Sequence, residues 1–138
     1  MSQRFLLDAC VISEGVRKRP NKRVLEKLQR FESSSVTSST VWNELWFGAD
    51  LLADSERKEL IHAYLTSLER ALPVLAYDKA AARWHARERA RLQVAGSPRP
   101  FADGQIAAVA VANDLVLVTD NVADFAHFSE LRVENWHR

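Results

Sequence analysis

The sequence has little cysteine, glycine or proline and no long apolar run. Its one cysteine, Cys10, cannot form a disulfide within the chain, which is typical of a reducing compartment. Four glycines and four prolines among 138 residues, of which 47% are hydrophobic, argue against a disordered chain and favour one folded domain over residues 1–138. No apolar run approaches the roughly 20 residues of a membrane helix, and the first residues lack the pattern of a secretion signal. We therefore expect a cytoplasmic protein that makes no contact with a membrane.

The chain also lacks an excess of either charge, but its charges are unevenly distributed. The formal net charge is +1, yet residues 15–30 contain seven Lys or Arg and one Glu, whereas residues 101–138 contain two Arg and six acids. A basic surface beside an acidic pocket suits a metal-dependent enzyme that acts on a polyanion. A solvated basic helix is the alternative interpretation of residues 15–30.

Short apolar stretches alternate with helical patterns along the chain. Continuous apolar runs are typical of strands covered on both faces. We expect strands at 4–8, 35–38, 72–77, 115–119 and 131–135. Helices are expected in the basic stretch ending near 31 and at 41–52, 54–68, 79–94 and 101–112, with a short turn at 125–128. The expected N-caps are Ser39 or Thr40 for the second helix and Asp78 for the fourth. This alternation predicts a three-layer α/β fold whose mainly parallel central sheet is flanked by helices.

Four acidic residues lie where an expected strand ends or a helix begins. Asp8 and Asp120 each follow a strand, and Asp103 lies at the start of an Ala- and Val-rich helix. Glu44 shares a face of its helix with core positions such as Leu45, so its carboxylate needs a partner. The carboxyl ends of parallel strands meet at one edge of the sheet, where ligands bind, and all four carboxylates can converge there. For Asp103 alone, a helix-capping role is the alternative.

A cluster of these four carboxylates favours a metal site. Like charges this close raise one another's pKa, so a dry cluster without a cation would be costly. All-oxygen ligands, with no His or Cys set at metal spacing, favour Mg²⁺ or Mn²⁺ over Zn²⁺. We therefore predict Asp8, Glu44, Asp103 and Asp120 as catalytic metal ligands, and the cation would activate a water molecule for attack on a phosphodiester.

Four motifs, in this order and at these separations, carry a family resemblance: LLDACVIS, VWNELWFG, FADGQIAAVAVAN and LVLVTDNVADF. The chain resembles the PIN-domain family over essentially its whole length, and specifically the VapC-like toxin ribonucleases of bacterial toxin-antitoxin pairs. The resemblance implies a PIN-like fold and a Mg²⁺- or Mn²⁺-dependent endoribonuclease, whose first, second and third acids are Asp8, Glu44 and Asp103. It also implies a small inhibitory antitoxin as partner and, commonly, a homodimer.

The chain departs from this family at the first and last motifs. The family typically has Asp-Thr-Asn at the first, and Ala9 and Cys10 replace the Thr and Asn, so a hydroxyl and an amide near the site are lost. Groups that support metal ligands affect the rate, so this change bears on turnover. At the last motif the family often has an acid at the position of Asn121. Only one of two successive residues can face the metal directly, and we assign that role to Asp120, with Asn121 as a neutral ligand or phosphate contact. Asp124 is interpreted as a cap of the next turn.

Several side chains near these motifs are candidates for binding. The predicted contacts with the RNA backbone are Asn121 and the basic residues Arg17, Lys18, Arg19, Lys22 and Arg23, and a second basic set at helical spacing is Arg83, Arg87 and Arg91. Three aromatic residues crowd around Glu44, namely Trp42, Trp46 and Phe47. They either form an apolar groove for an antitoxin segment or a dimer contact, or they pack under the neighbouring helix.

Other interpretations of the chain are less well supported by its residues. The phosphate loop of cysteine phosphatases needs an Arg one position closer to the Cys than Arg17 is to Cys10, so we expect Cys10 to be a small buried residue. The four histidines are scattered, which argues against a general base. Two functional alternatives remain: a PIN-like RNA- or protein-binding module without turnover, motivated by Ala9 and Cys10, and a small-molecule phosphate hydrolase, which the extended basic surface disfavours.

Overall fold

Five parallel strands form the centre of the molecule, in the order β3-β2-β1-β4-β5. The computed structural model describes residues 2–138. Its strands are β1 (Phe5–Leu7), β2 (Ser35–Ser38), β3 (Val74–Leu75), β4 (Val116–Val118) and β5 (Arg132–Glu134). Leu6 of β1 lies opposite Val36 on one side and Leu117 on the other, and all three are fully buried. The continuous apolar runs therefore predicted the central strands correctly.

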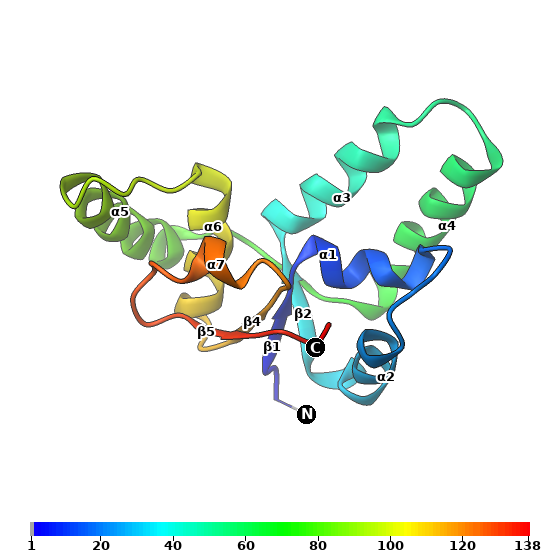
Figure 1. The fold of residues 1–138 in the computed structure, drawn as a ribbon, viewed down its shortest axis with the longest axis horizontal. Coiled ribbons are helices and arrows are strands. Elements are labelled where there is room, and N and C mark those ends of the chain that lie inside the picture. Colours follow the sequence, from blue (N-terminus) through cyan, green and yellow to red (C-terminus); the bar gives the residue numbers. More distant parts are fainter. Residues whose placement is uncertain (1) are drawn as a thin grey trace.

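Helices cover both faces of this sheet, which confirms the predicted α/β fold. One side carries α1 (Ala9–Ile12), the 3₁₀ turn η1 (Ser13–Val16), α2 (Lys22–Arg30), the 3₁₀ turn η2 (Glu32–Ser34), α3 (Ser39–Leu51) and α4 (Glu56–Ala71) (Figure 1). The other side carries α5 (Lys79–Val94), α6 (Phe101–Ala112) and α7 (Val122–Phe125). Right-handed crossovers give this division, because the chain moves outward from β1 to β3 and then returns past β1 to β4 and β5.

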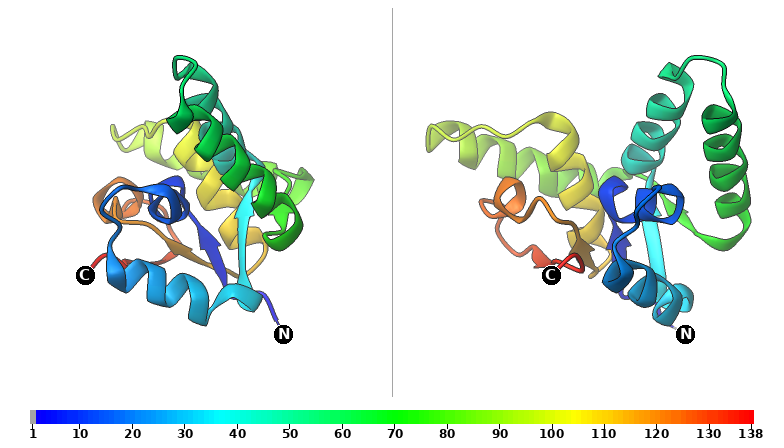
Figure 2. Two further views of the ribbon diagram at one scale, coloured as in Figure 1. Left: turned by 90° about the vertical axis from the view of Figure 1, so that its right-hand side faces the viewer. Right: turned by 45° about the vertical axis from the view of Figure 1, so that its right-hand side comes forward.

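The helices α3 and α4 form an antiparallel pair that extends beyond the sheet (Figure 2). None of the helices within residues 2–138 is long and apolar enough to cross a membrane.

The basic segment, residues 15–30, is not the one helical stretch predicted. It begins in the 3₁₀ turn η1, which follows α1, and continues through a loop into α2. The break lies at Pro20, which lacks a backbone N–H and disfavours helical backbone in the residue before it. Asn21 then caps α2, because its side chain accepts the backbone N–H groups of Arg23 and Val24 at 2.9 and 3.2 Å.

Helix caps and edge strands differ from the predictions by a few residues. Ser38 caps α3, since its hydroxyl accepts the N–H of Val41 at 3.2 Å, so the predicted caps Ser39 and Thr40 are wrong. Asp78 caps α5 as predicted, accepting a backbone N–H of the first turn at 2.9 Å. β3 is shorter than predicted because, at the edge of the sheet, it pairs only with the last two residues of β2.

The helix α6 is buried on nearly all sides because it lies between the sheet and α5. We predicted an inner face formed by Ile106, Ala107, Ala110 and Val111, of which the first three are buried and Val111 is half-buried. Ala108 and Val109 are buried as well, since α5 packs against the other side of α6. Small side chains permit this close packing and hold the start of α6 at the edge of the sheet.

Candidate active site

The carboxylate of Asp8 lies at the end of β1, at the edge where the parallel strands end. It caps α1 by accepting the N–H of Ala9 at 2.8 Å, and it accepts the hydroxyl of Thr119 at 2.7 Å. Burial raises the pKa of Asp8, since the side chain is 6% exposed, and the charges of Asp120 and Asp124 raise it further, while the two hydrogen bonds lower it. Asp8 is therefore a fixed carboxylate in a site rich in negative charge.

The hydroxyl of Thr119 is a functional group that the sequence analysis missed. Thr119 is fully buried at the end of β4 and also accepts the backbone N–H of Asn121 at 3.1 Å. Its hydrogen bond to Asp8 places a hydroxyl beside the carboxylate. Ala9, which stands where the family typically has Thr, has no hydroxyl to offer. The signal was present in the sequence, because Thr119 follows β4 at the same edge as Asp8.

Cys10 packs beside Asp8 as a half-buried side chain. Its Sγ lies 4.0 Å from Asp8 Oδ2 and 3.6 Å from the Thr119 hydroxyl. Burial raises the pKa of Cys10 to about 12, so the thiol stays protonated at neutral pH. The nucleophile in thiol chemistry is the thiolate, and this environment disfavours it.

Glu44 faces away from the hydrophobic core, which corrects our prediction. The buried positions of α3 are Val41, Leu45 and Ala49, and the side chain of Glu44 lies one position round the helix and is exposed. It borders a groove between α1 and η1 on one side and α3 and α4 on the other, lined by Ala9, Ser13, Val16, Arg17, Glu44, Leu45, Gly48, Ala49, Leu52, Arg57, Ile61, Tyr64 and Leu65. Partial burial of the carboxylate raises the pKa of Glu44, and the negative charges of Asp8 and Asp103 raise it further.

Asp103 lies in the first turn of α6, where the N-cap residue Pro100 makes no side-chain capping bond. Its side chain is half-buried. Burial raises the pKa of Asp103, and the charges of Asp124 and Asp8 raise it further, whereas Arg99 lowers it. α6 therefore places Asp103 near Asp8 and near Asp124, whose charge acts on both carboxylates.

The last motif contributes two carboxylates to this edge. Asp120 is 40% exposed, and its Oδ2 lies 3.9 Å from His137 Nε2. Asp124 lies within α7, so its predicted role as a cap is wrong. It lies 3.6 Å from the guanidinium of Arg99, and it raises the pKa of both Asp8 and Asp103. The sequence analysis did not include Asp124 in the site. It placed the short helical turn at 125–128, three residues after the observed start of α7.

Asn121 is exposed and lies immediately before α7, without a side-chain capping bond. It borders a second hollow formed by Asp120, Val122, Ala123, Asp124, Asn135 and Arg138. The amide therefore lies beside both carboxylates of the last motif, and it carries no charge there.

The carboxylates fit a divalent cation by their chemistry. The charge of Asp8 raises the pKa of both Glu44 and Asp103, and Asp120 and Asp124 raise that of Asp8. This repulsion is the electrostatic cost that a cation removes. All their donor atoms are oxygens, the type that Mg²⁺ and Mn²⁺ prefer. Across residues 2–138, however, no three His, Cys, Asp or Glu side chains are already gathered as metal ligands. Glu44 is exposed and has several rotatable bonds, so it is the side chain best able to reorient toward a cation.

The predicted basic residues are exposed along the loop and the start of α2. Arg17, Lys18 and Arg19 lie in the loop, and Lys22 and Arg23 lie in the first turn of α2. Arg17 alone of these five borders the groove beside Glu44. On α5, Arg83 and Arg87 are exposed, but Arg91 donates to Glu88 and to the carbonyl of His127, so its guanidinium is engaged within the fold.

The aromatic residues around Glu44 divide between packing and exposure. Trp42 and Trp46 are half-buried and meet edge to face at 6.1 Å, and Trp46 packs against His62 of α4 at 5.1 Å. These two therefore pack between α3 and its neighbour. Phe47 is 62% exposed.

The chain is similar to one known family over nearly its whole length. The PIN domain family model matches residues 5–131. Among curated relatives, "Toxin FitB" from Neisseria gonorrhoeae is 31% identical and the alignment covers 96% of this chain and 99% of FitB. The "tRNA(fMet)-specific endonuclease VapC" from Salmonella typhimurium is 30% identical, and the alignment covers 96% of this chain and 98% of VapC.

Solved structures agree with the sequence comparison. A chain of FitAB bound to an IR36 DNA fragment superposes with a TM-score of 0.88 at 28% identity, covering 97% of this chain and 96% of that one. A chain of DNA-bound VapBC from Salmonella typhimurium gives a TM-score of 0.84 at 30% identity, covering 97% and 98%. The protein therefore belongs to the PIN-domain family.

Proposed function

We propose that the protein is a cytoplasmic, Mg²⁺- or Mn²⁺-dependent endoribonuclease that acts as the toxin of a toxin-antitoxin pair. The observation that carries the proposal is the position of Asp8, Glu44 and Asp103 at one edge of a PIN-family sheet, where the charge of Asp8 raises the pKa of both Glu44 and Asp103. These three residues would hold the cation, and Asp120 would be the fourth ligand. Asp124 adds negative charge beside them. A bound divalent cation would neutralise the carboxylates and polarise both a water molecule and the scissile phosphate.

The surrounding residues would prepare the site for an RNA strand. Thr119 and the N–H of Ala9 hold the Asp8 carboxylate in one orientation, so its position does not depend on bound substrate. The exposed cations of the loop, Arg17 to Arg19, and of α2, Lys22 and Arg23, would neutralise backbone phosphates. The amide of Asn121 would donate to a phosphate oxygen without adding a charge to the site.

The groove beside Glu44 supports an antitoxin partner. Its apolar lining includes Leu45, Leu52 and Ile61, which suits a segment with apolar side chains that ends at the acidic site. The relatives FitB and VapC are found in FitAB and VapBC structures, which agrees with a protein partner. Exposed apolar side chains further along α3, Phe47 and Leu51, support a homodimer contact in the complex.

Cleavage of RNA by the purified, partner-free protein tests this function. A pool of structured RNA is incubated with Mg²⁺ or Mn²⁺, beside an Asp103→Asn variant and an EDTA control. We expect cleavage by the wild type, none in either control, and products with a 5′-phosphate and a 3′-hydroxyl. Products with a 2′,3′-cyclic phosphate would contradict hydrolysis by an activated water.

A binding module without turnover is the second candidate, because Ala9 and Cys10 depart from the family motif. It predicts intact RNA in every lane together with measurable binding of RNA. The small-molecule phosphate hydrolase is tested in the same assay, since a phosphate ester that competes with long RNA for the site would favour it.

A further inference from the structure

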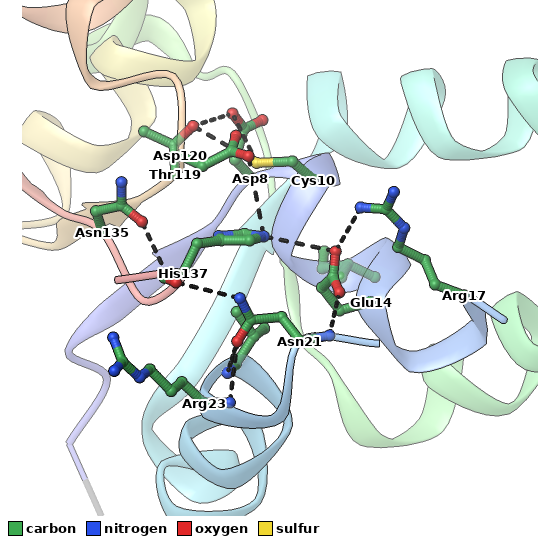
Figure 3. A network of polar contacts seen from close by, with 12 residues as sticks. Asp8, Cys10, Glu14, Arg17, Asn21, Arg23, Thr119, Asp120, Asn135 and His137 are labelled. Atoms are coloured by element: carbon green, nitrogen blue, oxygen red, sulfur yellow. Dashed lines mark hydrogen bonds and ion pairs between the residues drawn. The ribbon is translucent and has the colours of Figure 1, made fainter. Parts of the chain in front are cut away.

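A buried carboxylate, Glu14, organises polar contacts beside the candidate active site (Figure 3). Glu14 lies in η1 and is 1% exposed. Its two oxygens accept the backbone N–H of Asn21 at 2.7 Å and the guanidinium of Arg17 at 2.8 Å. His137 Nε2 lies 3.5 Å from the oxygen that Arg17 contacts. A carboxylate this buried is costly unless it is paired, and Glu14 is paired on several sides.

The C-terminal segment holds this arrangement in place. The side chain of Asn21 donates to the backbone carbonyl of His137 at 3.1 Å. The neighbouring Trp136 is fully buried and packs against Phe5 at 5.2 Å and Phe31 at 5.7 Å. Glu14 is thus fixed by elements distant in sequence. Burial alone would raise its pKa, but the hydrogen bonds of Asn21 and Arg17 outweigh burial and lower it, so Glu14 is ionised at neutral pH.

Arg17 is the one exposed member of the pair. Its side chain is 62% exposed, and within residues 2–138 its guanidinium has Glu14 as its hydrogen-bond partner. It borders the groove that also contains Glu44 and Ala9. After Glu14, the charge of Asp120 also raises the pKa of Arg17. One guanidinium nitrogen of Arg17 is therefore bonded to Glu14, while the exposed remainder of the group faces solvent at the rim of the acidic site.

We propose that Glu14 is a positioning residue that fixes the guanidinium of Arg17 at the rim of the carboxylate cluster, where Arg17 contacts the phosphodiester of the bound RNA. The inference rests on the proposed function. A planar guanidinium can engage a phosphate through two parallel N–H donors, but only when the group is held in a suitable orientation. A free arginine on a loop would sample many rotamers, and the bond to a buried, immobile carboxylate removes most of that freedom.

The chain contains a matched control for a buried Glu that holds an Arg three residues later. Glu88 of α5 is 6% exposed, accepts two hydrogen bonds from Arg91 at 2.9 Å and accepts the backbone N–H of Ser129 at 2.7 Å. This is the same chemistry as Glu14 with Arg17 and Asn21. Neither Glu88 nor Arg91 borders the groove beside Glu44. Glu88→Gln therefore measures the structural cost of losing such a carboxylate without touching the site.

A double-mutant cycle on RNA cleavage tests the proposal. We expect Arg17→Ala and Glu14→Gln each to lower kcat/KM by about tenfold, and the double variant to be no worse than Arg17→Ala, because Glu14 acts through Arg17. Glu88→Gln should lower the melting temperature as Glu14→Gln does, but leave kcat/KM within about twofold. Additive losses in the double variant, or an equal loss of kcat/KM in Glu88→Gln, would overturn the proposal.

Arg17→Lys keeps the proposal testable even when Glu14→Gln fails to fold, since Arg17 is exposed and its replacement leaves the core intact. Lysine retains the charge but not the planar fork, so we expect it to behave like Arg17→Ala. A kcat/KM equal to wild type in Arg17→Lys would overturn the positioning role.

Binding of RNA separates this inference from the proposed function. The Asp103→Asn protein provides a background in which RNA affinity is measured without turnover. In this background, Arg17→Ala should weaken RNA binding by several-fold. Adding Glu14→Gln to Arg17→Ala should weaken binding no further. If the wild type fails to cleave RNA, the proposed function fails, whereas this binding cycle still supports or overturns the contact between Arg17 and RNA.

Discussion

Replacing Gly104 with alanine should destabilise the protein, although alanine is the better helix former. Gly104 is buried in the first turn of α6, next to Asp103. A Cβ built there would clash with the ring of His85, with His85 Nε2 nearest, Cδ2 at 2.6 Å and Cε1 at 2.9 Å. The ring cannot withdraw easily, because it is 1% exposed, its Nδ1 lies 2.8 Å from the Tyr77 hydroxyl, and it packs against Phe101 at 4.8 Å.

The size of the effect follows from two opposing contributions. Alanine gains about 1 kcal/mol over glycine within a helix. Overpacking a rigid core costs about 1–3 kcal/mol, and a contact with three ring atoms places Gly104→Ala at the upper end of that range. The net loss is about 2 kcal/mol. With an unfolding entropy of about 2.1 cal/mol/K per residue, this lowers the melting temperature of a 138-residue chain by about 7 °C.

Gly48 of α3 provides the control, because nothing lies within 4 Å of a Cβ built there. Gly48→Ala should raise the melting temperature by about 3 °C, the full gain in helix propensity. Calorimetric melts of both variants, with Gly104→Ala also placed in a His85→Ala background, separate the two contributions. In that background the clash is gone, and Gly104→Ala should stabilise. A Gly104→Ala protein at least as stable as wild type would refute the argument that His85 blocks the first turn of α6.

Further predictions concern the carboxylates. Asp8, Glu44 and Asp103 have pKa values raised above their unfolded values, so the folded protein binds more protons than the unfolded chain once pH rises above about 4. Their contribution to stability therefore falls as pH rises toward neutrality, and melts of the metal-free protein in EDTA should show a lower melting temperature at pH 7 than at pH 5. Glu88 acts in the opposite direction: its pKa is lowered from 4.5 to about 2, so its contribution is lost as pH falls from about 4.5 toward 2, and the same melts should decline again on that side. Thr119→Val removes the 2.7 Å hydrogen bond to Asp8 and should weaken Mn²⁺ binding about 10- to 100-fold in a calorimetric titration, while an unchanged affinity would mean that the hydroxyl does not support a metal ligand.

The parts of the fold that depend on local sequence could be predicted from it. β2 and α6 begin and end at the expected residues, and the small-residue helical spacing that predicted α6 is a local pattern. Asp8 and Asp103 were predicted for the same reason, since Asp8 directly follows a strong strand pattern and Asp103 lies in the first turn of a strong helix pattern. Thr119 was overlooked although it follows a predicted strand, because the pairing of β4 with β1 is what brings its hydroxyl to Asp8.

Other features depend on contacts between segments far apart in the sequence. The face of α3 that is buried is set by how α4 and α1 pack against it, so Glu44 was expected on the core side and lies at the groove instead. The hydrogen bond from Asn21 to the carbonyl of His137 and the proximity of Glu14 to His137 join the first quarter of the chain to its end. Such pairings follow from the order of strands in the sheet and could not be read from spacing.

The most direct test of the account is the thermal stability of the wild type and of Asp103→Asn, each measured in EDTA and in excess Mn²⁺. Without metal, the account predicts that Asp103→Asn is the more stable protein, because one of several mutually repelling charges is gone. With Mn²⁺ at about 100 times its dissociation constant, the wild type should gain about 2.7 kcal/mol, or about 9 °C, and Asp103→Asn should gain little. An equal rise in both proteins, or none in the wild type, would contradict a metal site built from these carboxylates.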